Sequence, residues 1–227
     1  EVNKEDTNKQ LWVGTYEGLA CLENEKWTIY KTTNSALPDN NIESLLYTSP
    51  NTLWIGSWGG LTKVENNKWT TYNISNSALP ENRVMSLLET TINQEKILWV
   101  GTTGGLACFQ KDKWSTFTTK NSPLPHNQID SILATKSNNN SQVIWLGTWG
   151  GGLVKLELAN NTDSSNLVTA AKWTVYNTEN SKLPNNLIKT LKETNNNGQQ
   201  IIWIGTNGGL AQFFPNNLNK AWQVLFK

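Results

Sequence analysis

The stretch Leu53-Trp54-Ile55-Gly56-Ser57 contains a five-residue pattern that recurs along the whole chain. The pattern is a hydrophobic residue, Trp, a hydrophobic residue, Gly, and then Thr or Ser. Its five copies begin at residues 11, 53, 98, 144 and 202, so the intervals between them are 42, 45, 46 and 58 residues. Self-similarity at such a period indicates a repeat architecture. The copies also align the repeats with one another, so that shared positions can be separated from variable ones.

The second repeat predicts four short strands separated by turns. The predicted strands cover residues 42–48, 52–57, 61–65 and 68–72, and each is bounded by Gly, Pro, Asn or Ser. No helical pattern lies between them. Four short antiparallel strands in about 45 residues are typical of a β-propeller blade. We label these strands A to D, from the central axis outward.

The whole chain is therefore expected to be all-β, a single propeller over residues 1–227 with five four-stranded antiparallel blades. The expected blades cover approximately residues 1–30, 31–72, 73–117, 118–176 and 177–227. The first blade has a clipped inner strand, because only residues 1–6 are left to form it. A closed five-bladed ring is the favoured arrangement. The alternatives are a piece of a larger propeller and closure of the ring between chains.

Two rows of Trp are expected to form the core between blades. Strand B contributes one row and strand D the other, and each buried Trp removes about 150–250 Å² from water. The Gly two residues after the strand B Trp shares its face of the sheet, so it leaves room for a bulky side chain from the next blade. The two rows are Trp12, Trp54, Trp99, Trp145 and Trp203, and Trp27, Trp69, Trp114, Trp173 and Trp222.

The combined motif of the chain resembles the two-component regulator propeller repeat. The motif consists of Leu-Trp-Ile-Gly-Thr-x-Gly-Gly-Leu, then Trp-x-x-Tyr, then Leu-Pro-x-Asn and an apolar strand, and it covers nearly the whole chain. The resemblance implies a bacterial sensor-type propeller, as in the extracytoplasmic regions of hybrid histidine kinases, and hence a periplasmic or extracellular location. Such propellers commonly have seven blades, whereas this sequence contains five repeats and neither a kinase nor a transmembrane segment.

The composition disfavours several classes of partner. The net charge is +1 and only 16% of residues are charged, so no basic footprint for nucleic acid is present. No apolar run approaches the roughly 18 residues that span a bilayer. Cys21 and Cys108 occupy one repeat position two repeats apart, which predicts two free thiols rather than a disulfide. Because Lys63 and Lys155 occupy the same position elsewhere, we expect the thiols to lie near the surface.

Variable loop positions give the candidate ligand site. The B-to-C hairpins and the D-to-A links of a propeller emerge on one face, around the mouth of the channel, and loops on a rigid scaffold commonly carry function. Aromatic groups there supply stacking area, whereas charged and amide groups supply orientation. The alternative interpretation is that these side chains only cover neighbouring hairpins. The candidate residues are Tyr16, Trp58, Thr103, Trp149 and Asn207 from the hairpins, and Asp39, Glu81, Arg83 and His126 from the links.

The sequence offers little for catalysis or metal binding. His126 is the only histidine, which leaves no second His for a metal site or a triad. Asp39 and Glu81 lie at equivalent positions of adjacent links and are a candidate acid pair. We expect all three to be solvated turn residues. A loop at residues 160–163 contains Asn and Asp and is a weak Ca²⁺ candidate. No catalytic residue, metal or cofactor is therefore predicted.

The function predicted from the sequence is non-enzymatic. The chain is expected to be a monomeric sensor-type or scaffold propeller that binds a small polar molecule, a glycan or a peptide at the channel mouth. The alternatives are a lectin-like glycan-binding propeller, and a propeller fragment or engineered scaffold that assembles into a larger ring without a ligand of its own.

Overall fold

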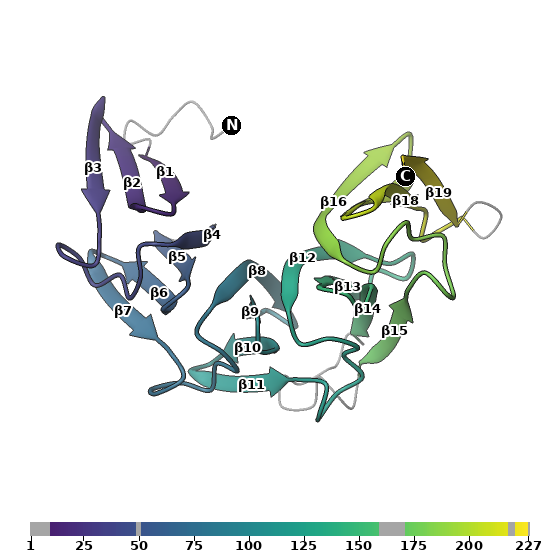
Figure 1. Cartoon of the computed structure of the whole chain (residues 1–227), viewed down its shortest axis with the longest axis horizontal. Coiled ribbons are helices and arrows are strands. Elements are labelled where there is room, and N and C mark those ends of the chain that lie inside the picture. The colour runs from purple at the N-terminus through teal and green to yellow at the C-terminus, as the bar shows by residue number, and fades with distance from the viewer. Residues whose placement is uncertain (1–9, 49–50, 159–170, 218–220, 227) are drawn as a thin grey trace.

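The computed structural model describes residues 10–48, 51–158, 171–217 and 221–226, and within these ranges the chain contains strands but no helix (Figure 1). Each repeat forms its own antiparallel sheet, in which consecutive strands are neighbours. The expected all-β architecture of five blades is confirmed. Because the described residues contain no helix, none of them forms a helix that could cross a membrane.

The strand bounds follow the repeat closely. In the second repeat, the predicted and observed strands differ by one residue at the start of the third strand. Blade one contains β1 (Gln10–Thr15), β2 (Gly18–Glu23) and β3 (Lys26–Tyr30), and blade two contains β4 (Ile42–Thr48), β5 (Thr52–Ser57), β6 (Gly60–Glu65) and β7 (Lys68–Tyr72). Blade three contains β8 (Val84–Ile92), β9 (Glu95–Thr102), β10 (Leu106–Gln110) and β11 (Lys113–Phe117). Blade four contains β12 (Ile129–Lys136), β13 (Gln142–Thr148), β14 (Leu153–Leu158) and β15 (Lys172–Tyr176), and blade five contains β16 (Ile188–Asn196), β17 (Gln199–Thr206), β18 (Gly209–Phe213) and β19 (Trp222–Phe226).

Blade one has three strands within the described residues. The inner strand expected over residues 1–6 lies outside them, as does the Ca²⁺ candidate at residues 160–163.

Turn chemistry explains how each sheet folds back on itself. The C-to-D turns of blades one to three consist of two residues that both have positive φ, such as Asn66 (50°) and Asn67 (62°). Two consecutive positive φ values match the right-handed twist of a tight hairpin. At the B-to-C hairpin, the hydroxyl that ends the repeated pattern donates to a Gly carbonyl, as Ser57 Oγ does to Gly60 O at 2.9 Å. The Thr or Ser of the motif therefore stabilises the B-to-C hairpin through its side-chain hydroxyl.

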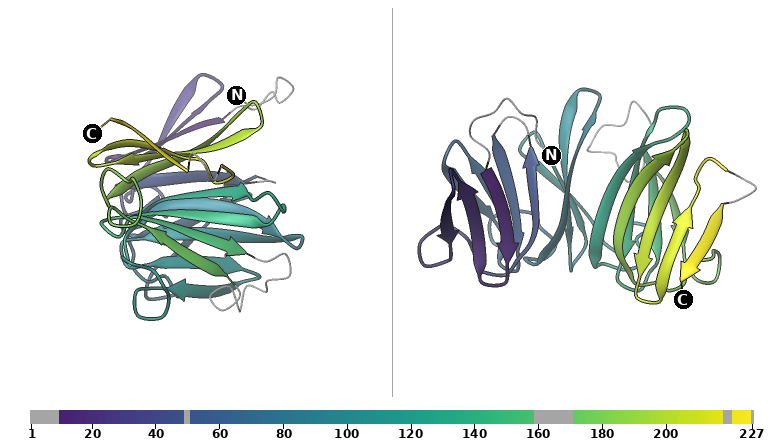
Figure 2. Two further views of the ribbon diagram at one scale, coloured as in Figure 1. Left: turned by 90° about the vertical axis from the view of Figure 1, so that its right-hand side faces the viewer. Right: turned by 90° about the horizontal axis from the view of Figure 1, so that it is seen from above.

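The blades pack through two different faces. The face that carries the strand B Trp lies against the aliphatic face of the next blade; Trp54 packs with Leu98 and Val100, and Trp145 packs with Ile202 and Ile204. Figure 2 shows the sheets of neighbouring blades standing side by side. Each contact buries apolar surface from both partners, which is the main source of stability for a stacked repeat.

The repeated Gly of strand B makes this close approach possible, as the sequence predicts. A Cβ added to Gly14 would lie 2.6 Å from the Ile42 side chain of the next blade, and one added to Gly147 would lie 2.7 Å from Ile188. Such distances are shorter than van der Waals contact. The Gly therefore forms a socket for a β-branched side chain of the following blade.

The D-to-A links are held by a repeated network of hydrogen bonds. Asn40 Oδ1 accepts from Thr32 N at 2.9 Å, and Asn82 makes the same bond with Ile74 N. The Leu before the Pro of each link is buried, and in three links the Pro carbonyl lies against the first Gly of the Gly-Gly hairpin, as Pro38 does against Gly59. The Leu-Pro-x-Asn signature is therefore explained by structure.

The expected closed ring is wrong for this structure. The blades form an open arc, with the inner strands on the concave side and blades one and five on either side of the opening (Figure 1). Leu11 and Val13 of blade one are 55% and 37% exposed, whereas the equivalent Leu53 and Ile55 are 4% and 0% exposed. Five blades at the spacing set by these contacts leave the two end faces uncovered.

Two further expectations need correction. Most of the Trp rows are buried or half-buried, but Trp27 is 55% exposed because no blade lies in front of blade one. The two cysteines are free, as predicted, but both are buried rather than near the surface. At their position Lys63 and Lys155 extend past the Trp rings to reach a carboxylate, whereas the short thiol stays beneath the surface.

Candidate functional site

The B-to-C hairpins and D-to-A links meet at one end of the strands, as expected. In four blades the first hairpin residue donates its backbone N–H to a carbonyl of the adjoining link. The bonds run from Trp58 to Asn41, from Thr103 to Arg83, from Trp149 to Gln128 and from Asn207 to Leu187, at 3.0–3.2 Å. We call this set of hairpins and links the loop face. Because backbone bonds fix the loops to one another, the side chains of the loop face are held on a rigid base.

Trp58 is the centre of a charged cluster on the loop face. Its indole Nε1 donates to Glu43 Oε1 at 2.6 Å, and the same oxygen accepts from Arg83 Nη2 at 2.8 Å. The Arg83 guanidinium lies 4.2 Å from the centre of the Trp58 ring. Glu43 belongs to β4 of blade two, whereas Arg83 precedes β8 of blade three. The cluster therefore joins two blades through a cation–π contact and an ion pair.

Trp149 also lies beside a cation and a carboxylate in blade four. Lys189 Nζ of blade five lies 3.6 Å from the centre of the Trp149 ring and 3.7 Å from Asp130 Oδ2. Asp130 occupies the strand position of Glu43, and its Oδ1 accepts from Gln128 Nε2 at 2.8 Å. Both Trp side chains are 41% exposed. Two alternate blades thus present an exposed indole that a cation of the next blade holds in place.

The remaining candidates on the loop face are not gathered into one cluster. Tyr16 and Asn207 are exposed, and Thr103 is half-buried. Asp39 Oδ1 accepts from Asn41 N at 2.7 Å, His126 Nδ1 accepts from Gln128 N at 3.1 Å, and Glu81 Oε1 accepts from Asn82 N at 2.8 Å. These three side chains therefore stabilise the turns of their own links.

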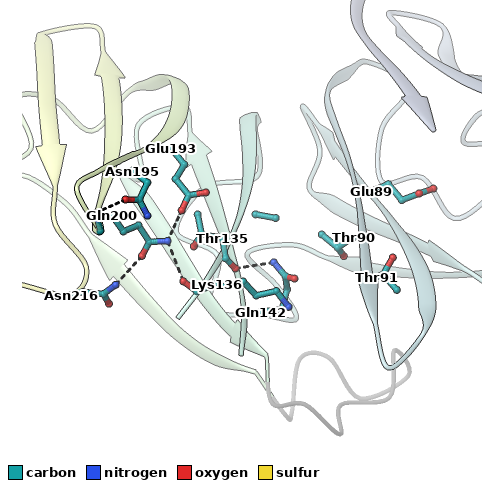
Figure 3. A pocket seen from close by; sticks show the side chains of 12 residues that line it. Glu89, Thr90, Thr91, Thr135, Lys136, Gln142, Glu193, Asn195, Gln200 and Asn216 are labelled. Carbon is teal, nitrogen blue, oxygen red and sulfur yellow. Dashed lines mark hydrogen bonds between the residues drawn. The ribbon is translucent and has the colours of Figure 1, made fainter. Parts of the chain in front are cut away.

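A second hollow lies at the other end of the inner strands. A polar cavity of about 710 Å³ is lined mainly by residues of β8, β12 and β16, together with Gln142 of β13, Gln200 of β17 and Asn216 (Figure 3). Gln200 donates to Glu193 Oε1 at 2.6 Å and to Lys136 O at 3.1 Å, while Glu89 pairs with Lys96 at 3.0 Å. In Figure 3, Glu89 lies apart from Glu193 on the opposite wall. No sequence pattern indicated a site here.

A third hollow separates blades one and two. This groove has a volume of about 660 Å³, and its walls include Trp12, Tyr30, Trp69, Cys21 and Val64. Trp12 and Tyr30 are stacked at 5.7 Å, and Tyr30 and Trp69 lie 5.3 Å apart. The sequence contained a signal for it, because Val64 stands where other repeats have Phe109, Leu156 and Phe213.

Burial sets the ionisation of the thiols. Desolvation raises the pKa of Cys108 well above its ordinary value, and desolvation together with the nearby Glu23 carboxylate raises the pKa of Cys21. Both thiols are therefore protonated at neutral pH, which makes them poor nucleophiles. In the described part of the chain, no group of three or more His, Cys, Asp or Glu side chains is placed to hold a metal ion.

Comparisons with known proteins agree with the resemblance seen in the motif. Residues 36–59 match the family described as two component regulator propeller. Two similar crystal structures from B. thetaiotaomicron are extracellular domains of proteins described as hybrid two component systems, BT3049 and BT4673. They share 26% and 24% sequence identity with the chain, with TM-scores of 0.71 and 0.64, and the matches cover 96% and 89% of this chain. The resemblance to two-component regulator propellers is thus confirmed.

The matches cover only 27% and 25% of those two structures, so this chain spans about a quarter of their length. An ancestral GH74 enzyme is also similar, with 16% identity, a TM-score of 0.62 and coverage of 97% of this chain and 30% of the enzyme, which shows the fold alone. No curated protein matches the chain.

Proposed function

We propose that the chain is a non-enzymatic recognition module of a sensor-type propeller, and that its ligand binds at the loop face over Trp58 and Trp149. The main support is that both indoles are 41% exposed and yet held by neighbouring charges. An exposed aromatic ring with a fixed orientation is a stacking platform that loses little entropy on binding. The similarity to extracellular domains of two-component systems supports a sensor role.

The polar groups beside each indole favour a ligand with hydroxyl or amide groups. Glu43 and Arg83 flank one indole, while Asp130 and Lys189 flank the other, so each platform offers both acceptors and donors. A neutral oligosaccharide or a short peptide combines an apolar face for the ring with such polar groups. We propose that the chain performs this function in the periplasm or outside the cell.

Single substitutions of the two indoles test the proposal. We expect Trp58→Ala and Trp149→Ala each to weaken binding at least tenfold for any probe that binds the wild-type chain, because loss of a stacked Trp commonly costs about 1.4 kcal/mol or more. The measurement is calorimetric titration with maltohexaose, cellohexaose and tri-alanine. Trp27→Ala is the control, because Trp27 is also exposed but lies in β3, away from the hairpins. Equal affinity in all three variants would contradict the proposal.

A second function is favoured by the open ends of the arc. In blades two to five, the aliphatic face is covered by the strand B Trp of the blade before it. In blade one this face is uncovered and exposes Leu11, Val13, Trp27 and Ile29. At the other end of the arc, the strand B Trp of blade five, Trp203, is only half-buried. The two uncovered faces are complementary, because every contact between neighbouring blades joins a Trp face to an aliphatic face. We infer that they pack against further blades of the same repeat type, from a longer polypeptide or from a second copy, to make a larger ring.

The mass in solution tests this assembly. We expect the isolated chain, of 25.4 kDa, to show a mass by light scattering that rises with protein concentration, because head-to-tail contact buries the exposed apolar residues. Replacing Leu11 and Val13 by Asp should keep the chain at 25.4 kDa, since the exposed positions tolerate charge in the free chain but not in a contact. A wild-type mass that stays at the monomer value would overturn packing against a second copy.

A further inference from the structure

The groove between blades one and two is best understood from the two other contacts in which the same space is filled. Between blades two and three, the Phe109 ring stands edge-on to Trp54, with the ring centres 6.1 Å apart. Between blades four and five, Phe213 meets Trp145 in the same way at 5.5 Å. In both contacts the Phe comes from the third strand of the later blade and fills the space beside the Trp and Tyr of the earlier blade.

A cation completes both of these filled contacts. Lys63 Nζ lies 5.7 Å from the centre of the Trp54 ring and 2.9 Å from Glu65. Lys155 Nζ lies 5.7 Å from the Trp145 ring and 2.8 Å from Glu157. Each filled contact thus consists of an aromatic ring and an ammonium group, set against a Trp and a Glu.

The contact between blades one and two lacks both fillers. Val64 pairs with Leu53 as Phe109 pairs with Leu98, and Cys21 pairs with Trp12 as Lys63 pairs with Trp54. The receiving groups remain, since Trp12, Tyr30 and Glu23 all line the groove. Glu23 accepts from Gln10 Nε2 at 2.9 Å, and no ion pair joins it to any Lys or Arg of the described segments.

A cysteine alone does not open such a groove. Cys108 occupies the Lys position in blade three, but there Leu156, Leu158 and Ile92 join the same cluster as Trp99. Trp99 is fully buried as a result. The groove of blade one therefore depends on the combined loss of the ring and the cation.

We propose that this groove binds an arylalkylammonium, a small molecule or side group in which an aromatic ring and a primary ammonium are joined by a short linker. The ring takes the place of Phe109 and Phe213, between Trp12, Tyr30 and Trp69. The ammonium takes the place of Lys63 and Lys155, beside Trp12 and Glu23. An ammonium that is partly removed from water gains from both the indole face and the carboxylate.

This site is separate from the loop face. The groove is lined by Tyr47, Asn51 and Asn67, which lie at the A-to-B and C-to-D turns of blade two, whereas Trp58 lies in its B-to-C hairpin at the opposite end of β5. Trp58→Ala should therefore leave groove binding unchanged, and either proposal can fail without the other.

The test uses phenethylammonium, with benzyl alcohol and ethylammonium as probes that carry only one of the two groups. By calorimetric titration of the whole chain, we expect saturable one-to-one binding of phenethylammonium and at least tenfold weaker binding of the other two. Replacing Cys21 by Lys and Val64 by Phe copies the filled contacts, so this double variant should bind at least tenfold more weakly and melt at the same or a higher temperature. Unchanged affinity in the double variant, or no saturable binding to the wild type, overturns the proposal.

Two more variants keep the test decisive if the filled variant does not fold. Glu23→Gln should weaken phenethylammonium binding at least tenfold and leave that of benzyl alcohol unchanged, because it removes only the charge. Replacing Lys63 by Cys and Phe109 by Val should create a second site between blades two and three. Equal loss of both probes in Glu23→Gln would contradict the assignment of the ammonium to Glu23.

Discussion

Replacing Trp145 by Ala is expected to lower the free energy of unfolding by about 3–5 kcal/mol, the usual cost of removing a large buried aromatic side chain. Trp145 is 1% exposed, its ring contacts Phe213 and Tyr176 of two different blades, and its indole donates to Thr135 Oγ1 at 3.0 Å. The substitution removes a filler between blades four and five and leaves Thr135 without its donor. Urea denaturation followed by far-UV circular dichroism measures the effect.

Trp203→Ala is the matched control, because Trp203 holds the same repeat position and makes the same bond, to Thr194 Oγ1 at 2.8 Å. In this structure no blade covers its outer face, so the loss should be clearly smaller than for Trp145 at a concentration where the chain is monomeric. If the two substitutions cost the same, the assignment of blade five as an uncovered end would be wrong.

The second large effect is expected at the Gly socket. Gly147→Ala should cost about 1–3 kcal/mol, because the new methyl group would press against Ser131 and the Ile188 side chain of the next blade. Ile188 is fully buried and cannot retreat easily, whereas the Ser131 hydroxyl can rotate away. The same denaturation measurement gives the value.

Gly205→Ala supplies the comparison for the socket. Its new methyl group would meet the Thr190 side chain of its own blade, at 2.7 Å, and no residue of a following blade. A rotation of Thr190 relieves that contact, so we expect a loss of less than about 1 kcal/mol. A cost at Gly205 that equals or exceeds the cost at Gly147 would show that the socket does not receive a neighbouring blade.

The fold could be predicted in detail because the repeat gives five independent copies of the same evidence. The strands of the second repeat, the two Trp rows and the Gly socket all follow from alternation along a strand and from turn residues. Closure of the ring could not be predicted in this way. It depends on the angle between neighbouring blades, which arises from packing of side chains such as Ile42 and Val84 against the Gly sockets and has no local pattern.

The candidate site was only partly predictable. Comparison of loop positions selected Trp58 and Trp149, but their partners Glu43 and Lys189 lie on inner strands and were not selected. Asp39 and His126 differ in chemistry and yet perform the same structural task, accepting a backbone N–H two residues ahead. Variation at a loop position is therefore weak evidence for ligand binding when several residue types provide the same acceptor.

The hollows away from the loop face required the structure. The groove between blades one and two arises from two small residues, Cys21 and Val64, that are 43 positions apart in the sequence and belong to different blades. Neither residue is unusual within its own repeat. Only the packing of blade two on blade one shows that both small side chains leave the same space between the blades unfilled.

Nuclear magnetic resonance of the twelve Trp indole N–H groups tests the central claim, recognition at the loop face, most directly. The signals of Trp58 and Trp149 are assigned from their Ala variants, and the wild-type chain is then titrated with maltohexaose, cellohexaose and tri-alanine. We predict that a probe that binds saturably shifts the signals of Trp58 and Trp149 and leaves those of the buried Trp99 and Trp145 in place. Saturable binding without any shift of the two loop-face signals would contradict the account.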